Sequence, residues 1–510
     1  MLLAMVHRFV KVERVGSVLS AAPFCGRRRV STHEPRNLID AYGEAKRICY
    51  SKKPPPDVNS RAVFATNELH LSHINTYGFD YDYTLADYKP AMHHLIYDLG
   101  KQALVEQYKY PQEVSNLQYL PNFAVRGLHY DIQKGLLLKV DSFNQIQLGS
   151  VYRGLSKVSD EEVLALYGST LLPVNYIEPP PGRSHVEARM VQLADLFSLP
   201  EMCLMCQVTD LFVTNNIDFQ PAVLFSDVRN AIGSIHPKMH GIVSKNPASY
   251  LKENPDLVPY LERLVQEERK LFLITNSPFD FVDRGMQFLA GPEWRSLFDL
   301  VVVEAKKPKF FTQWSSPLRR FDLGTRSKTW SQVTEVKKGQ VYCEGNVRQL
   351  QQLTGWSGGN VLYFGDHPYT DLADVRLHHG WRTGAILWEL DHEISILNQP
   401  EYKANSNWLQ QLQQLIESEQ NELRRPENKP IMQQWVAERD QLRLYTKNIF
   451  NNQFGSLFRT HHNPTYFSRR LFHFCDLYTS SISNLLDLNT AHVFFPRRGA
   501  LPHEYRSMFV

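Results

Sequence analysis

The sequence predicts an α/β protein with a parallel sheet at its core, a large inserted domain and a helical extension at the C-terminus. Three observations support this. Short β-branched or aromatic runs alternate with helical patterns such as PYLERLVQEERK, which is the order expected of a parallel sheet. The 510 residues exceed what one ordinary core holds. The stretch between the first and second runs is far too long for a loop.

Each of the four strand-like runs ends abruptly in polar residues. The first ends at Asp80 and Asp82, in the stretch YGFDYDYTLADY. The other three are KLFLITNS (270–277), LFDLVVVEAKKP (297–308) and NVLYFGDHPYTDL (360–372). Ligands of parallel sheets gather at the carboxyl ends of the strands. We therefore expect the four polar tips to meet in one place.

We expect four regions along the chain. Residues 1–34 form a basic leader, and residues 35–87 and 255–405 together form the core that carries the four tips. The inserted residues 88–254 have apolar content of their own, so we expect a separate cap domain over the strand ends. The final residues, 406–510, contain patterns such as NWLQQLQQLIESEQNEL and are expected to form a helical region.

The leader carries most of the charge imbalance of the chain. Its apolar and serine residues are mixed with arginine and lysine, and Glu13 is the one acid among residues 1–30. Such composition is typical of an organelle transit peptide and predicts a mitochondrial protein; a disordered basic tail on a cytoplasmic protein is the alternative. The net charge of +3 predicts no nucleic-acid partner. No run elsewhere approaches the roughly 18 apolar residues that a membrane span needs.

The cysteines are scattered along the chain, unlike a disulfide framework. Cys203 and Cys206 form a C-x-x-C pair, a spacing also found in zinc and redox sites, but no second pair follows at metal-binding spacing. Because the pair lies in a Leu- and Met-rich helical pattern, we interpret both residues as buried thiols.

The polar tips contain the groups that phosphoryl transfer requires, which are a nucleophile, a general acid and donors for the phosphoryl oxygens. Asp80 can attack phosphorus and form an aspartyl phosphate. Asp82 can protonate the leaving oxygen and later deprotonate the attacking water. Thr275 and Asn276 can donate hydrogen bonds, and Lys307 supplies a fixed positive charge.

The same tips also favour a divalent cation. Asp80 and Asp82 lie two residues apart, so in a strand they point to the same side, and Thr84 follows two residues later. Carboxylates held so closely repel each other unless a cation or a shared proton intervenes. Asp366 and Asp371 supply further oxygen ligands of the kind that Mg²⁺ prefers. The sequence therefore predicts Mg²⁺ as the cofactor.

The ordered set D-x-D-x-T, Thr, Lys and G-D-x-x-x-x-D resembles the haloacid dehalogenase-like superfamily, which has a Rossmann-like parallel sheet as its core. Further stretches are similar to the cytosolic purine (IMP/GMP-preferring) 5′-nucleotidase family, and within it to the 5′-nucleotidase domain-containing proteins. They include GFDYDYTL, RGLHYDIQKGLLLKVD, DVRNAI, FDLVVVEAKKPKFF, YFGDHPYTD and GSLFR. The similarity runs from about residue 35 to about residue 504.

This resemblance implies a role for each residue at the tips. Asp80 corresponds to the nucleophile and Asp82 to the general acid and base. The implied metal ligands are Asp80, Asp82 through its main-chain carbonyl, and Asp366; the implied phosphate-binding residues are Thr275, Asn276 and Lys307; Thr84 and Asp371 are supporting residues.

The expected substrate contacts from the cap are Phe197, Arg229 and His236. Enzymatic members of the family stack the purine on a Phe-Asn pair, where this chain has Phe197 and Ser198. Gly233 stands where those members have an aspartate, and losing a charged hydrogen-bond partner costs on the order of 1.5–3 kcal/mol. Core packing of Phe197, a surface ion pair of Arg229 and a helix-closing role of His236 are the alternatives.

The sequence therefore predicts a Mg²⁺-dependent phosphohydrolase that acts on a phosphate monoester, a nucleoside 5′-monophosphate, through an aspartyl phosphate. Two alternatives remain open. One is a catalytically weak nucleotidase-like scaffold that binds a partner, which the changes at Gly233 and Ser198 favour. The other is a phosphotransferase that uses the same intermediate. The resemblance also implies a homo-oligomer, either a dimer or a tetramer.

Overall fold

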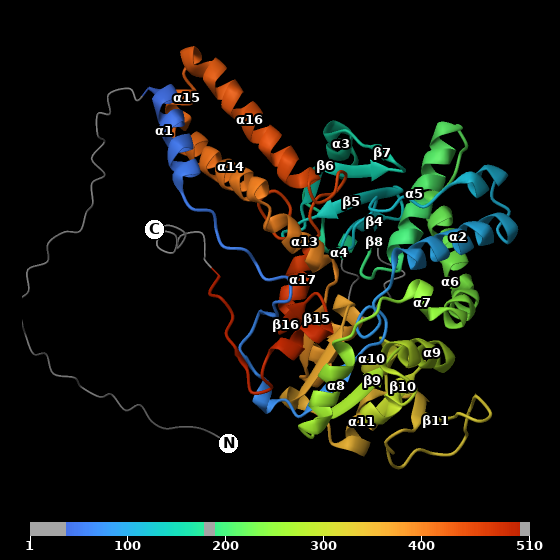
Figure 1. Cartoon of the computed structure of the whole chain (residues 1–510). Coiled ribbons are helices and arrows are strands. Elements are labelled where there is room, and N and C mark those ends of the chain that lie inside the picture. The colour runs from blue at the N-terminus through green and yellow to red at the C-terminus, as the bar shows by residue number, and fades with distance from the viewer. Residues whose placement is uncertain (1–36, 178–188, 500–510) are drawn as a thin grey trace, which may run out of the picture.

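The structure, a computed structural model, describes residues 37–177 and 189–499. The basic leader expected over residues 1–34 lies outside the described residues. The centre of the molecule is a ten-stranded sheet in the order β1-β16-β15-β14-β3-β9-β10-β13-β11-β12 (Figure 1). Its strands in this order are β1 (Phe64–Ala65), β16 (Leu477–Thr479), β15 (Arg382–Ile386), β14 (Val361–Gly365), β3 (Thr76–Phe79), β9 (Lys270–Ile274), β10 (Leu300–Val303), β13 (Val341–Glu344), β11 (Leu318–Asp322) and β12 (Ser327–Lys328).

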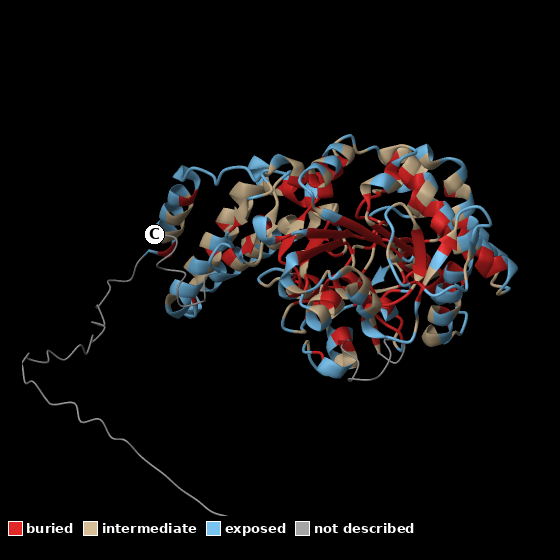
Figure 2. Ribbon diagram, turned by 90° about the horizontal axis from the view of Figure 1, so that it is seen from below, coloured by how far each residue is buried: buried red, intermediate tan, exposed pale blue. Residues whose placement is uncertain are grey.

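The strands from β16 to β13 all run parallel, and the antiparallel pairings occur only at the two edges of this sheet. Side chains of β9 enter both faces: Leu271 and Leu273 pack in one apolar cluster, and Phe272 and Ile274 pack in another. Burial on both faces explains the continuous apolar runs in the sequence, because helices cover both sides of a parallel sheet. The buried residues accordingly concentrate along the central strands (Figure 2).

Short helices and turns connect these strands. The helices of the core are α8 (Leu257–Gln266), α9 (Phe279–Ala290), α10 (Lys309–Thr312), α11 (Val347–Thr354), α12 (Asp374–His379) and α13 (Glu389–Leu397). The shorter helical turns of the described chain are η1 (Leu71–His73), η2 (Gln112–Asn116), η4 (Trp294–Leu297), η5 (Gly358–Asn360), the π-type η6 (Pro368–Ala373), η7 (Pro426–Asn428) and η8 (Ile482–Asp487).

The inserted residues 88–254 contain a second, five-stranded sheet whose strand pairs are all antiparallel. Its strands in spatial order are β7 (Ser156–Lys157), β6 (Ile146–Arg153), β5 (Leu136–Val140), β4 (His129–Asp131) and β8 (Met190–Gln192). The helices of this region are α2 (Pro90–Glu106), α3 (Asp160–Tyr167), α4 (Val174–Ile177), α5 (Ser198–Thr214), α6 (Pro221–Lys245) and α7 (Pro247–Tyr250). Cys203 and Cys206 are free, buried thiols on α5, as predicted.

The C-terminal part is not purely helical, which corrects the expectation for residues 406–510. Its helices are α14 (Pro400–Ser418), α15 (Gln420–Leu423), α16 (Lys429–Asn448) and α17 (Tyr466–Phe474). After them β16 joins the central sheet beside β15, and β17 (Val493–Phe494) pairs with β2 (Leu69–His70). Strands of two or three residues are too short to show an alternating pattern in the sequence. They can be identified only from the strands with which they pair in the folded structure.

A helical arm is formed by α14, α16 and the N-terminal helix α1 (Leu38–Ser51), which lie side by side (Figure 1). Its small core contains Leu38, Trp408, Leu412 and Trp435. In the described parts of the chain, no helix combines the length and the apolar character needed to cross a membrane.

Candidate active site

Four neighbouring strands, β14, β3, β9 and β10, bring the four polar tips together at their carboxyl ends. Asp80 follows β3, Thr275 follows β9, Lys307 follows β10 by a few residues, and Asp366 follows β14. The main-chain N–H of Asp80 donates to the carbonyl oxygen of Phe364 at 2.8 Å, so the parallel pairing of β3 and β14 continues to the first catalytic candidate. The predicted meeting of the tips is confirmed.

Lys307 lies between two carboxylates of this cluster. Its Nζ is 2.8 Å from Oδ1 of Asp80 and 2.7 Å from Oδ1 of Asp371, and its side chain is almost completely buried. Against the opposing effect of burial, Asp371 and Asp80 raise the pKa of Lys307 well above its usual value, so the ammonium group is retained. Burial raises the pKa of Asp80 to about 6, and Lys307 opposes that rise.

Asp82 has a different environment from Asp80. Its Oδ1 accepts a hydrogen bond from the Tyr88 hydroxyl at 2.6 Å, and its Oδ2 accepts one from the Ser277 hydroxyl at 2.7 Å. Burial, followed by the nearby Asp80 charge, raises the pKa of Asp82 to about 6. One carboxyl group of the pair therefore contacts a cation directly, while the other contacts two neutral hydroxyls.

The side chain of Asn276 is engaged in holding the main chain of Lys307. Its Oδ1 accepts from the Lys307 N–H at 2.6 Å, and its Nδ2 donates to the Lys307 carbonyl at 3.1 Å. The fully buried Thr275 accepts a hydrogen bond at Oγ1 from the Ser277 N–H at 3.1 Å. In this arrangement the side chains of Thr275 and Asn276 brace the loops, and the hydroxyl at this strand end that contacts a carboxylate of the site belongs to Ser277.

Asp366 is held by an arginine from the cap. Arg126 Nη1 donates to the Asp366 carbonyl at 3.0 Å and lies 3.5 Å from its Oδ2. The other nitrogens of the guanidinium donate to both carboxylate oxygens of Glu389, at 2.8 and 2.6 Å. Burial raises the pKa of Asp366 well above its usual value, and Arg126 opposes that rise.

Asp80, Asp366 and Asp371 form an acidic cluster in which one oxygen of each carboxylate lies within 4.8 Å of the others. These three carboxylates and Asp82 bring more negative charge than Lys307 and Arg126 can neutralise, since Arg126 is shared with Glu389. A compact set of carboxylate oxygens with excess negative charge fits a hard divalent cation such as Mg²⁺.

Two further residues at the tips depend on close packing. A Cβ at Gly365 would lie 2.3 Å from Cβ of Asp371. No larger residue therefore fits between β14 and the segment that follows it and carries Asp366 and Asp371, here called the acidic loop. Thr84 is buried, and its hydroxyl has no hydrogen-bond partner in the described structure.

Above the acidic cluster lies a cleft of about 380 Å³ that is also lined from the cap. Phe197 and His236, two of the predicted substrate contacts, line it, and Phe197 also packs edge-on against Tyr83 with ring centroids 4.9 Å apart. His236 does not close a helix, because α6 continues to Lys245. Burial lowers the pKa of His236.

Arg229 is not among the described residues that line the cleft, contrary to expectation. Its guanidinium lies 5.8 Å from the ring centre of Phe225, and its charge acts on the half-buried Glu201. Gly233, one turn further along α6, is exposed, and a Cβ there would meet nothing within 4 Å. The cap therefore places neither a cation at position 229 nor a side chain at position 233 in the cleft.

Several residues of the site were not predicted from the sequence. Ser277 could have been found, since it directly follows the two predicted donors at the same strand end. Tyr88 lies close to the D-x-D pair, but nothing in the sequence shows that its hydroxyl turns back to Asp82. Arg126 opens the family-like stretch RGLHYDIQKGLLLKVD, but nothing in the sequence indicates that it reaches Asp366. The cap and loop residues that line the cleft without having been predicted are Asp195, Met239, His240, His367 and Thr370.

The fold and this site define a phosphoric monoester hydrolase, with carboxylates and a lysine at the ends of adjacent parallel strands. A model of the 5′ nucleotidase family matches residues 63–506. The chain belongs to this family.

Relatives of this chain include 5′-nucleotidase domain-containing protein 2 from Homo sapiens, 46% identical over 457 residues, which cover 88% of this chain and 87% of that one. The protein of that name from Rattus norvegicus is 45% identical over 474 residues, covering 92% and 85%. The crystal structure of a predicted phosphoglycolate phosphatase from Haemophilus somnus 129pt aligns with 62% of this chain and 85% of that one, at 11% identity and a TM-score of 0.26.

Proposed function

We propose that this protein hydrolyses a phosphate monoester, a nucleoside 5′-monophosphate, with Mg²⁺ and through an aspartyl phosphate on Asp80. The observation that supports this most directly is the contrast within the D-x-D pair. Asp80 contacts the ammonium of Lys307, whereas Asp82 contacts two hydroxyls. Different surroundings let one carboxyl group act as a nucleophile and its neighbour as an acid.

In the first step, a carboxylate oxygen of Asp80 forms a bond to phosphorus while the bond from phosphorus to the ester oxygen breaks. Asp82 transfers its proton to the departing alcohol oxygen. The hydrogen bonds from Tyr88 and Ser277 fix the orientation of the Asp82 carboxyl group for this transfer. Lys307 offers positive charge to the phosphoryl oxygens, which gain negative charge as the bond breaks.

In the second step, water attacks phosphorus of the aspartyl phosphate and Asp82 accepts its proton, so free phosphate and the Asp80 carboxylate are regenerated. The acidic cluster of Asp80, Asp366 and Asp371 would hold Mg²⁺, with Arg126 orienting Asp366. When bound, Mg²⁺ supplies charge compensation for the carboxylates and the phosphoryl group.

The test is phosphate release from a panel of nucleoside monophosphates and other phosphate monoesters, with Mg²⁺ and after EDTA treatment. Asp80→Asn should abolish release, because an amide is not a nucleophile towards phosphorus. Asp98→Asn, an exposed change on α2, is the matched control and should behave as the wild type. Near wild-type turnover by Asp80→Asn would reject the mechanism.

A scaffold with weak catalysis is the second candidate, and the open space at Gly233 and the position of Arg229 favour it. It predicts that Mg²⁺ binds, as measured by isothermal titration calorimetry, while no ester in the panel is turned over. A phosphotransferase differs only in the acceptor. Adding a nucleoside to the assay should then produce a new nucleotide in place of free phosphate.

A further inference from the structure

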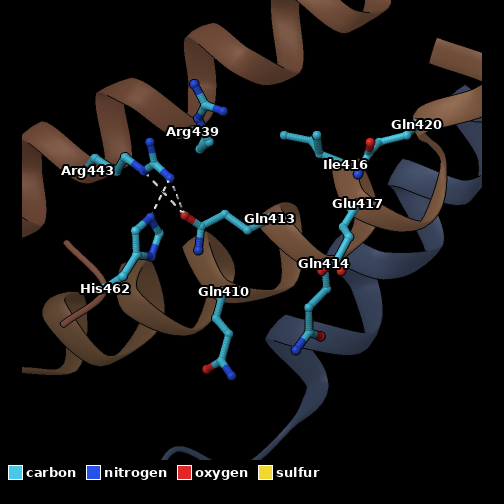
Figure 3. A pocket seen from close by; sticks show the side chains of 9 residues that line it. All are labelled: Gln410, Gln413, Gln414, Ile416, Glu417, Gln420, Arg439, Arg443 and His462. Atoms are coloured by element: carbon cyan, nitrogen blue, oxygen red, sulfur yellow. Dashed lines mark hydrogen bonds between the residues drawn. The ribbon is translucent and has the colours of Figure 1, made fainter. Parts of the chain in front are cut away.

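A second pocket, of about 400 Å³, lies in the helical arm between α14 and α16, and it shares no residue with the cleft above the acidic cluster. Figure 3 shows Arg443, Gln413 and His462 meeting on one side of it, with Ile416 and Glu417 on the other. Its lining residues are Gln410, Gln413, Gln414, Ile416, Glu417, Gln420, Arg439, Arg443 and His462.

The guanidinium of Arg443 is bound by neutral groups. Nη2 donates to Gln413 Oε1 at 2.9 Å and to His462 Nε2 at 2.9 Å, and Nε donates to the same Gln413 oxygen at 3.3 Å. Because a guanidinium can only donate, His462 accepts here as a neutral ring. The carboxylate of Asp440 is 3.9 Å from Nη1, beyond hydrogen-bond distance. Only 25% of the Arg443 side chain is exposed, so its charge is partly desolvated without a close counter-charge.

Other positive groups surround Arg443. Arg439 and Lys447 lie one turn before and after it on α16, on the same face. Burial and the neighbouring Arg439 charge lower the pKa of Arg443. Burial and Arg443 lower the pKa of His462, and burial and Arg443 lower that of His461 to about 4. The acids nearby are Asp440, which pairs with Arg439 at 2.8 Å, and Glu417 on the opposite wall.

The rest of the lining suits an organic group rather than a bare ion. The amide side chains of Gln410, Gln414 and Gln420 can both donate and accept hydrogen bonds, and Ile416 adds an apolar wall. The pocket combines an arginine that lacks a close carboxylate with several amide side chains and an apolar wall. These groups together suit a small molecule that carries a phosphate group.

We propose that the pocket between α14 and α16 binds a phosphate-bearing small molecule, with Arg443 as the main contact of the phosphate and Arg439 as the second. This site is separate from the candidate active site and does not depend on the proposed hydrolysis. Arg443 lines the pocket, and its Nη1 lies 3.9 Å from the Asp440 carboxylate.

The experiment is a calorimetric titration of the full chain with inorganic phosphate, in EDTA and at constant ionic strength set with chloride. The titration compares the wild type with Arg443→Gln and with Arg425→Gln. Arg425 is an exposed arginine outside the pocket, paired with Glu422, and its variant controls for the loss of one surface charge. All three proteins keep the acidic cluster and Lys307, so any difference between them reports on the arm. We expect Arg443→Gln to bind phosphate in the arm at least about tenfold more weakly, while Arg425→Gln matches the wild type.

Gln413→Glu provides a second, independent variant. It puts a carboxylate at the atom that already accepts from Arg443, so the fold gains an ion pair while the anion loses its partner. We expect unchanged or higher thermal stability together with loss of phosphate binding in the arm. Identical isotherms for the wild type, Arg443→Gln and Gln413→Glu would overturn the proposal.

Discussion

Arg126 of the cap and Asp366 of the core are joined by a buried hydrogen bond of 3.0 Å between the guanidinium and the main-chain carbonyl. The same guanidinium makes a bidentate ion pair with Glu389. Its Cζ lies 5.1 Å from the ring centre of Phe467. One cap residue thereby connects the acidic loop after β14, the start of α13 and helix α17. The position of Asp366 depends on the cap as well as on the sheet.

Replacing Arg126 by methionine should destabilise the fold by about 3–5 kcal/mol, because it leaves the mostly buried carboxylate of Glu389 without a partner. Urea unfolding measures this loss. The double variant Arg126→Met with Glu389→Gln should recover part of the stability, since the unpaired charge is removed. Equal stabilities of the single and double variants would show that the ion pair does not hold this junction.

Removing the Tyr88 hydroxyl should slow turnover while leaving the Michaelis constant nearly unchanged. Tyr88→Phe takes away the 2.6 Å hydrogen bond that orients Asp82, and a hydrogen bond to a charged group is worth about 1.5–3 kcal/mol, or roughly tenfold or more in kcat. Steady-state kinetics with the substrate found in the ester panel provides the measurement. Tyr83→Phe is the control, because that hydroxyl contacts His93 instead. A similar loss in both variants would point to disturbed packing.

Adding one methyl group at Gly365 should damage both stability and activity. The Cβ of alanine would lie 2.3 Å from Cβ of Asp371, so the acidic loop must move away from β14. Overpacking of this kind typically costs about 1–3 kcal/mol. Gly359→Ala, in the turn before the same strand, meets nothing within 4 Å and should be silent. Thermal unfolding and Mg²⁺ titration of the two variants test this difference. The prediction is contradicted if Gly365→Ala binds Mg²⁺ and unfolds like the wild type.

His129 should make the fold sensitive to acid. Burial lowers its pKa to about 3, and neither ring nitrogen has a partner in the described structure. Above pH 6.5 the ring is neutral in both states. Between pH 6.5 and 3 the unfolded chain binds a proton that the folded chain does not. The free energy of unfolding therefore decreases as the pH is lowered, by up to about 1.4 kcal/mol per pH unit.

The variant His129→Phe isolates this contribution, because it keeps an aromatic ring against Tyr466. Urea unfolding at pH 7 and at pH 5 should show a loss of stability larger in the wild type than in the variant, by roughly 2 kcal/mol. Parallel losses in the two proteins would mean that His129 is protonated in the folded state.

The sequence by itself determined the strands of the sheet centre and the chemistry at their ends. β3, β9, β10 and β14 are continuous apolar runs because both faces of the sheet are covered, and a run that stops at a polar residue marks the end of its strand. Asp80, Lys307 and Asp366 each lie within a few positions of such an end, so parallel pairing brings them to the same edge of the sheet.

Only the tertiary structure decided which groups complete the site and which face away from it. Arg126 reaches Asp366 across 240 residues of chain, and β16 joins the sheet from the far end of the sequence. Arg229 lies against Phe225 although the DVRNAI motif that contains it is present. Arg443 donates hydrogen bonds to Gln413 and His462, which come from other segments of the chain. Contacts between distant segments depend on how whole elements pack. A local sequence pattern determines which helix or strand a residue belongs to. It does not determine which other helices, strands or loops that element will pack against.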